Sequence, residues 1–193
     1  MNDKIQDVIS GYLQQQMLIA MPAMVDPNFS RSVTLMCQHN EDGAIGITIN
    51  RQSAFTLGEL FMQLNITCND SKISSLMVLE GGPVNPDRGF VLHSPVAGYD
   101  SSIKINDDIM VTTSRDILAA IAAGKGPQQF QVALGYAGWG DGQLESEMRQ
   151  NAWLSVPADK EILFKSALNR RWEQAVGKLG IDIENLHGVG GHA

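Results

Sequence analysis

Two alternating apolar stretches, close together in the sequence, constrain the fold of this chain most. Apolar side chains occupy every second position from Val33 through Leu35 to Cys37, and isoleucine does so at 45, 47 and 49. A period of two is typical of a β-strand. The sequence NEDG between the two stretches is typical of a turn. The sequence therefore predicts an antiparallel β-hairpin over residues 32–50.

Further elements follow the hairpin in runs of strands rather than in strict alternation with helices. Strands are predicted at 17–21, 76–80, 90–93, 103–105, 109–113, 129–134 and 153–156. Helices are predicted near 5–13, 56–64, 113–123, 142–149 and 168–179, and loops at 22–31 and 81–89. Such clustering of strands favours an α+β fold with a bent, largely antiparallel sheet flanked by helices. At 193 residues, one domain over 1–193 is expected.

Two of the predicted helices carry capping signals. Thr56 and Glu59 form the spacing of a capping box, and Thr113 with Asp116 repeats that spacing. Glycine at 124 is placed to end the second of these helices.

The charge of the chain bears on its partners. Lys and Arg number 14 against 21 Asp and Glu, a net charge of −7. Proteins that bind nucleic acid usually carry a basic patch that neutralises phosphates. No such patch is visible in the sequence, so we expect no direct binding to DNA.

Cysteine content and hydropathy bear on the compartment. Cys37 and Cys68 have no CxxC or metal spacing, so both are expected to be free thiols, with Cys37 in the core. The longest apolar run, MLIAMPAMV, is much shorter than the roughly 18 residues of a membrane helix. No membrane partner and a cytoplasmic location are therefore expected.

The segment GYAGWGDGQLESE, residues 135–147, has three interpretations. A phosphate site is disfavoured, because no Lys follows the glycines and the acids at 141, 145 and 147 would occupy the anion's place. Catalytic carboxylates are the second interpretation. The third, which we favour, is a structural corner between a strand and a helix. In that case glycines at 135, 138, 140 and 142 serve the backbone, with a positive φ at Gly138, Gly142 as N-cap and Glu145 at N3.

Metal binding and nucleophilic catalysis lack a sequence signal. The four histidines are widely spaced, and neither HExxH nor G-x-S-x-G occurs. His39 is expected to face solvent beside the hairpin turn, and His93 to be a hydrogen-bonded strand residue. We expect no metal and no cofactor.

Two hypotheses for function remain open. The first is a non-enzymatic ligand- or protein-binding regulatory module, with a small molecule or a protein as partner. The second is an enzyme acting on a small polar substrate through an unrecognised Arg, Glu and Asp site. Both draw on the same candidate binding residues, which lie in or near turns: Asp26, Arg31, Asn50, Arg51, Arg88, Trp139, Gln143, Glu145 and Glu147. They would share one cleft if the loops at 22–31 and 81–89 converge with the glycine-rich corner.

Several blocks, in their order along the chain, resemble the AlgH/YqgE family of bacterial proteins. They are LIAMPAMVDPNFSRSVTLMCQHNEDGAIGITINR, GGPVNPDRGFVLH, GYAGWGDGQLESEMRQNAWL, PADKEILF and RWEQAVGKLGID. The resemblance implies a soluble bacterial protein whose α+β fold contains a partly barrel-like sheet. Members are often labelled transcriptional regulators, and no catalytic residue is implied. Any effect on transcription would then act through a protein or a small ligand.

Overall fold

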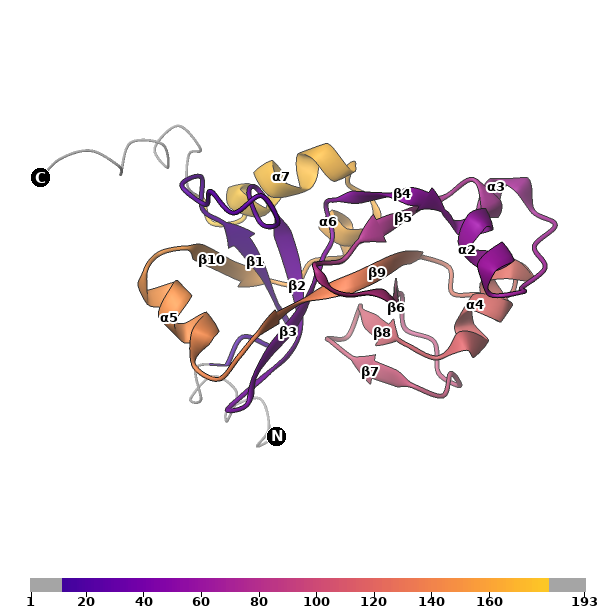
Figure 1. The fold of residues 1–193 in the computed structure, drawn as a ribbon, viewed down its shortest axis with the longest axis horizontal. Helices are drawn as coiled ribbons and strands as arrows, with labels where there is room; N and C mark the ends of the chain where they lie inside the picture. The colour runs from indigo at the N-terminus through magenta and orange to yellow at the C-terminus, as the bar shows by residue number, and fades with distance from the viewer. Residues whose placement is uncertain (1–11, 181–193) are drawn as a thin grey trace, which may run out of the picture. The chain divides into compact units, whose positions relative to one another are not determined.

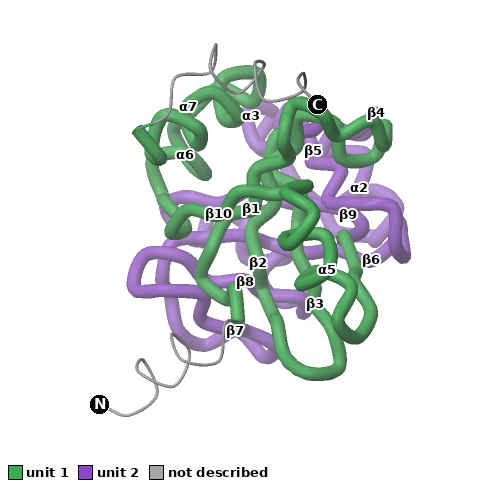
Figure 2. Tube along the Cα trace, turned by 90° about the vertical axis from the view of Figure 1, so that its left-hand side faces the viewer, with its two compact units in different colours: residues 1–50, 137–193 green, residues 51–136 purple. Residues whose placement is uncertain are grey.

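The computed structural model describes residues 12–180, so most of the helix predicted near 5–13 lies outside the described residues. By its internal contacts the chain divides into two compact units (Figure 2). Unit 1 comprises residues 1–50 and 137–193, and unit 2 comprises residues 51–136. That the whole chain forms one domain stays a prediction.

The sheet of unit 1 is antiparallel throughout (Figure 1). In order across the sheet, its strands are β10 (Trp153–Pro157), β1 (Gln16–Ala20), β2 (Val33–Asn40), β3 (Gly43–Thr48) and the last residues of β9 (Phe130–Trp139). The predicted hairpin is confirmed, since Thr34 pairs with Thr48 and Asn40 with Gly43. The register shifts between Met36 and Gln38, where a bulge interrupts the alternation. Cys37 lies in this bulge and is half-buried by surface area, while burial of its thiol raises the pKa of that group to about 12.

Among the residues described, unit 1 also contains the short helices α5 (Gln143–Arg149), α6 (Lys160–Phe164) and α7 (Arg171–Gly177) and the 3-10 turn η1 (Leu168–Arg170). The indole of Trp172 on α7 is buried and donates to the carbonyl oxygen of Ala20 at 2.9 Å. The guanidinium of Arg171 is also buried, and it donates to the carbonyl oxygens of Ile49 and Ser166. These bonds tie the predicted C-terminal helix to the sheet.

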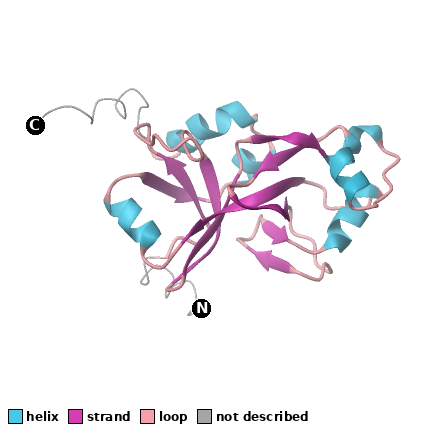
Figure 3. Ribbon diagram, in the orientation of Figure 1, coloured by secondary structure: helices cyan, strands magenta, loops and turns pink. Residues whose placement is uncertain are grey.

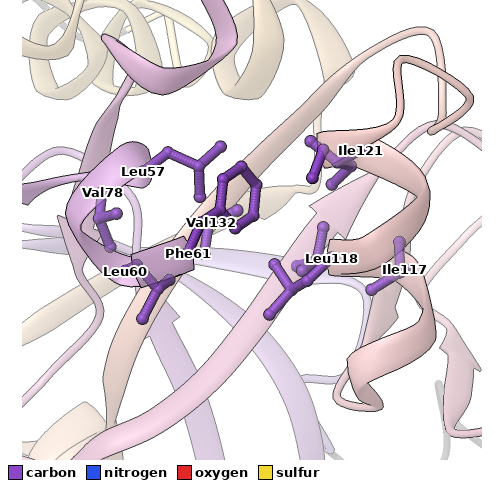
Figure 4. Close-up of a cluster of buried hydrophobic side chains, with 10 residues drawn as sticks. Leu57, Leu60, Phe61, Val78, Ile117, Leu118, Ile121 and Val132 are labelled. Carbon is purple, nitrogen blue, oxygen red and sulfur yellow. The ribbon is translucent and has the colours of Figure 1, made fainter. Parts of the chain in front are cut away.

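Unit 2 contains the remaining strands and helices (Figure 3). They are β4 (Gln52–Thr56), α2 (Leu57–Gln63), α3 (Ser71–Ser74), β5 (Met77–Glu80), β6 (Val84–His93), β7 (Ser102–Lys104), β8 (Met110–Thr112) and α4 (Arg115–Ala122). Its strands follow the order β4-β5-β9-β6-β8-β7, and only the β5–β9 pair is parallel. Helices α2 and α4 pack Phe61, Leu118 and Ile121 against Val132 of β9 (Figure 4).

Of the two capping signals predicted for the helices of unit 2, one is confirmed. At α2 the capping box is confirmed, because Thr56 Oγ1 accepts from the Glu59 backbone N–H and the Glu59 carboxylate accepts from the Thr56 N–H at 2.7 Å. At α4 the N-cap is Ser114 rather than Thr113, and the Ser114 side chain forms no capping hydrogen bond. Asp116 accepts instead from the N–H groups of Asp100 and Ile117.

Two strand boundaries differ from prediction. Residues 84–89, predicted as loop, belong to β6, whose register with β9 shifts between Val84 and Gly89. This irregularity lets turn-forming residues sit within a strand. Strand β9 continues beyond Leu134 to Trp139, so the first five of the thirteen residues of the predicted glycine-rich corner are strand.

Candidate functional site

Only two of the four glycines at the predicted corner have the left-handed conformation that favours glycine. They are Gly135, with φ 74°, and Gly142, with φ 66°. A Cβ at Gly135 would lie 2.3 Å from the carbonyl oxygen of Gly82, so a side chain is also excluded sterically. Gly138 pairs with Ile45 in the sheet and has no positive φ, so the prediction for that residue is wrong. Gly142 is the N-cap of α5, as predicted.

Glu147 joins three side chains of the corner. Its Oε2 accepts from the indole N–H of Trp139 at 3.0 Å and from that of Trp153 at 2.8 Å. Its Oε1 accepts from the Gln143 amide at 2.9 Å. Phe29 packs on both indole rings, with centroids at 6.2 and 5.6 Å. Three predicted binding residues, Trp139, Gln143 and Glu147, therefore meet here, and their polar side-chain atoms form hydrogen bonds with one another.

Glu145 stands at N3 of α5, as predicted, but its carboxylate contacts a histidine instead of the N-cap backbone. Its Oε1 lies 2.8 Å from His39 Nε2, and His39 Nδ1 accepts from the Leu13 backbone N–H at 3.0 Å. A ring nitrogen that accepts carries no proton, so neutral His39 carries its proton on Nε2 and donates it to Glu145. His39 is 1% exposed, and the expectation that it faces solvent is wrong, because Leu13 and α5 cover it.

The His39–Glu145 contact makes stability depend on pH. The pKa of the Glu145 carboxyl is lowered, first by its own backbone N–H and then by His39. A depressed folded-state pKa stabilises the fold above the pKa of the unfolded chain, and this contribution is lost as pH falls through the folded-state value. We expect wild type and Glu145→Gln to differ in free energy of unfolding at pH 7, and this difference to shrink as pH falls below about 4 towards the lowered folded-state pKa. Urea titrations across this range measure the difference. A gap that stays constant down to pH 3 would contradict the assignment.

Three further candidate residues of unit 1 stabilise the loop at 22–31. Asp26 caps a turn by accepting from the Asn28 N–H at 2.9 Å. The guanidinium of Arg31 lies 4.4 Å from the ring centroid of Trp172. Asn50 accepts from the Val33 N–H and donates to the Arg31 carbonyl oxygen. Phe29 of this loop contacts the glycine-rich corner. The predicted shared cleft requires this contact as well as one from the loop at 81–89.

Two candidate residues lie in unit 2. Arg51 accepts from the Glu80 N–H through its carbonyl oxygen. Arg88 lies over the rings of Phe90 and Tyr136, at 5.3 and 5.9 Å from their centroids. Their convergence with the candidate residues of unit 1 stays a prediction.

A pocket in unit 2 was not anticipated from the sequence. It has a volume of about 180 Å³ and lies among α2, the start of α4, β6 and β9. Its apolar lining comprises Leu60, Leu64, Phe90, Val91, Leu118, Val132 and Leu134. The polar groups at the pocket are those of Asp87, Thr112, Thr113, Ser114 and Arg115. A mostly apolar concavity with a few polar groups is the usual form of a small-molecule site.

Gly89 lies in the wall of this pocket. It pairs directly with Leu134, so both residues face the same side of the sheet, where Leu134 lines the pocket. Its φ is not positive, so the backbone does not require glycine. A Cβ built at Gly89 would meet no atom within 4 Å. Any larger residue would therefore extend into unfilled space at the pocket.

A chain of hydrogen bonds lies behind the wall of the pocket at Thr112. His93 Nδ1 lies 2.8 Å from the Ser94 carbonyl oxygen, which can only accept, so the proton is on Nδ1 and Nε2 accepts from Thr112 Oγ1 at 2.8 Å. Thr112 Oγ1 in turn lies 2.6 Å from Ser102 Oγ. Burial lowers the pKa of His93, which favours the neutral ring. A neutral histidine beside a hydroxyl is the geometry of a general base, but Thr112 is fully buried and its oxygen already has two partners.

The pocket escaped sequence analysis for a physical reason. Its apolar residues have the spacing of ordinary core residues on helices and strands, and Gly89 lies within the turn-rich sequence GGPVNPDRG. The prediction for His93 as a bonded strand residue is confirmed.

Within residues 12–180, no helix combines the length and apolar character that crossing a membrane requires. The same part of the chain holds no group of three His, Cys, Asp or Glu side chains placed to bind a metal ion. Both cysteines are free thiols.

Comparison with known proteins identifies the class. The fold is α+β with a curled, largely antiparallel sheet and flanking helices. The AlgH-like family model matches residues 17–184, and the chain belongs to this family. UPF0301 proteins of Xanthomonas oryzae and Xanthomonas campestris are each 51% identical over 186 residues, which is 96% of this chain and 99% of theirs.

Two solved structures are similar. The solution structure of the AlgH protein from Pseudomonas aeruginosa has a TM-score of 0.78 and 44% identity, covering 94% of this chain and 96% of its own. A crystal structure of a Corynebacterium diphtheriae protein has a TM-score of 0.72 at 18% identity, covering 90% and 91%, and shows likeness of fold alone. The predicted fold class, with its bent and partly barrel-like sheet, is confirmed by the likeness to AlgH.

Proposed function

We propose that this protein is a cytoplasmic, non-enzymatic regulatory module that binds a small molecule in the pocket of unit 2. The observation that carries the proposal is the mostly apolar pocket itself, with Gly89 in its wall, a strand position where the backbone allows a side chain and a Cβ would meet no atom within 4 Å. A mostly apolar pocket with a few polar groups at its rim is the arrangement expected of a ligand site.

The polar candidate residues of unit 1 support a module rather than an enzyme. Glu147 is bonded to two indoles and an amide, and Glu145 is bonded to His39. Carboxylates so engaged have a structural role that accounts for them without a substrate. The net charge of −7 supports action through a ligand or protein rather than through direct contact with DNA.

Filling the pocket tests the proposal. Gly89→Val should leave the free energy of unfolding unchanged or raise it by up to about 1 kcal/mol, because valine suits a strand and restricts the unfolded chain. The same variant should abolish binding of any metabolite that a ligand-observed NMR screen finds for the wild type. Gly89→Ala should weaken binding less than Gly89→Val does.

The control is Gly177→Ala on α7, where a Cβ also meets no atom within 4 Å and which does not line the pocket of unit 2. It should bind the ligand like the wild type. Unimpaired binding by a folded Gly89→Val variant would reject the pocket as the site. Conversion of the ligand during the screen would favour the enzyme hypothesis instead.

A further inference from the structure

The rim of the pocket carries two opposite charges. Asp87 on β6 and Arg115 at the start of α4 both line it, and both side chains are exposed. Arg115 is held in place by donating through one guanidinium nitrogen to the carbonyl oxygen of Leu64 at the end of α2. Within residues 12–180, Asp87 forms no hydrogen bond or ion pair. The rim therefore offers one anchored cation and one available anion above an apolar interior.

The interior limits the size of the group that can enter. Its volume is about 180 Å³, and its walls are leucine, valine and phenylalanine. An engineered apolar cavity of roughly 150 Å³ accommodates benzene. The apolar part of a ligand can thus be about as large as a benzene ring or a branched four-carbon chain.

Resting on the proposed function, we infer that the ligand is a small zwitterion with an apolar body, in chemical class an α-amino acid with an apolar side chain. Its carboxylate pairs with Arg115, which still has N–H donors beyond the one used by Leu64. Its ammonium group pairs with Asp87. Its side chain fills the space beside Gly89.

The two charges at the rim explain why a ligand with a single charge should bind the pocket less tightly than a zwitterion. A carboxylic acid without an amine gains Arg115 but is repelled by Asp87. An amine without a carboxylate gains Asp87 but is repelled by Arg115. Only a zwitterion places a favourable partner opposite each charge.

The test uses L-leucine, 4-methylpentanoate and 3-methylbutylamine, which share one branched hydrocarbon body, together with glycine, which has none. Dissociation constants come from protein-observed NMR titration of the full chain at low salt, where surface charges are least screened. L-leucine should bind at least about five-fold more tightly than either single-charge compound, the ratio that about 1 kcal/mol gives. Glycine should not bind measurably.

Two variants assign the charges. Arg115→Gln should reduce L-leucine affinity to that of the amine, and Asp87→Asn should reduce it to that of the acid. Neither side chain is buried, so both variants should fold. If all three branched compounds bind equally tightly and Gly89→Val weakens their binding, the inference that the ligand is a zwitterion would be overturned. The proposed ligand-binding function of the pocket would still stand. Failure of L-leucine to bind would also overturn the inference that the ligand is a zwitterion. If L-leucine binds equally well to the wild type and to Gly89→Val, the pocket is not the binding site.

Discussion

Replacing Gly135 by alanine should lower the free energy of unfolding by roughly 2–5 kcal/mol. Two costs act together at this residue. A non-glycine residue is strained at a φ of 74°, and its Cβ would approach the Gly82 carbonyl oxygen to 2.3 Å. Backbone cannot move aside as a flexible side chain can, so the strand pairing around Gly135 has to shift. Urea denaturation followed by circular dichroism measures the loss.

Gly142→Ala is the matched control. Gly142 has nearly the same φ, 66°, yet a Cβ there meets no atom within 4 Å. Its cost should be the conformational part alone, roughly 1–2 kcal/mol. If the two variants lose the same stability, close packing at Gly135 contributes nothing.

Glu147→Leu should destabilise the protein by roughly 2–5 kcal/mol, because it leaves two indole N–H groups without an acceptor. Trp139 and Trp153 are 6% and 2% exposed, so water cannot readily replace the carboxylate. The unfolding midpoint in urea, followed by tryptophan fluorescence, reports both the stability and the environment of these rings.

Glu147→Gln separates the hydrogen bonds from the charge. Its carbonyl oxygen can still accept from both indoles, so a loss of only about 1 kcal/mol is expected. A loss as large as that of Glu147→Leu would show that the negative charge, rather than the acceptor, is what the two indoles require.

Local signals in the sequence predicted the local structure well. The hairpin of β2 and β3 and the capping box at Thr56 depend on neighbouring residues, and both are confirmed. The strand character of residues 84–89 depends on pairing with distant β9, which no local pattern contains. Proline and glycine in GGPVNPDRG therefore favoured a loop, although a bulged strand also accommodates them.

Partnerships of side chains were the least predictable part of the candidate site. Sequence analysis placed Glu145 correctly at N3 of a helix capped by Gly142, yet its partner, His39, lies 106 residues earlier in the chain. The same applies to Glu147 and its indoles, and to the pocket around Gly89. Such contacts are products of tertiary packing, and they decide whether an acid is structural or available to a ligand.

The pairing of β1 with β10 has a consequence for biosynthesis. Gln16 of β1 pairs with Pro157 of β10, and Ala44 of β3 pairs with Trp139 of β9. A ribosome makes the β1–β2–β3 segment early, but the strands that cover its two edges arrive only after all of residues 51–136 have been made. Both edge strands of this hydrophobic nascent sheet therefore remain unpaired through much of translation. Exposed strand edges are templates for wrong pairing, so the nascent chain is at greatest risk of aggregation before its C-terminal quarter emerges.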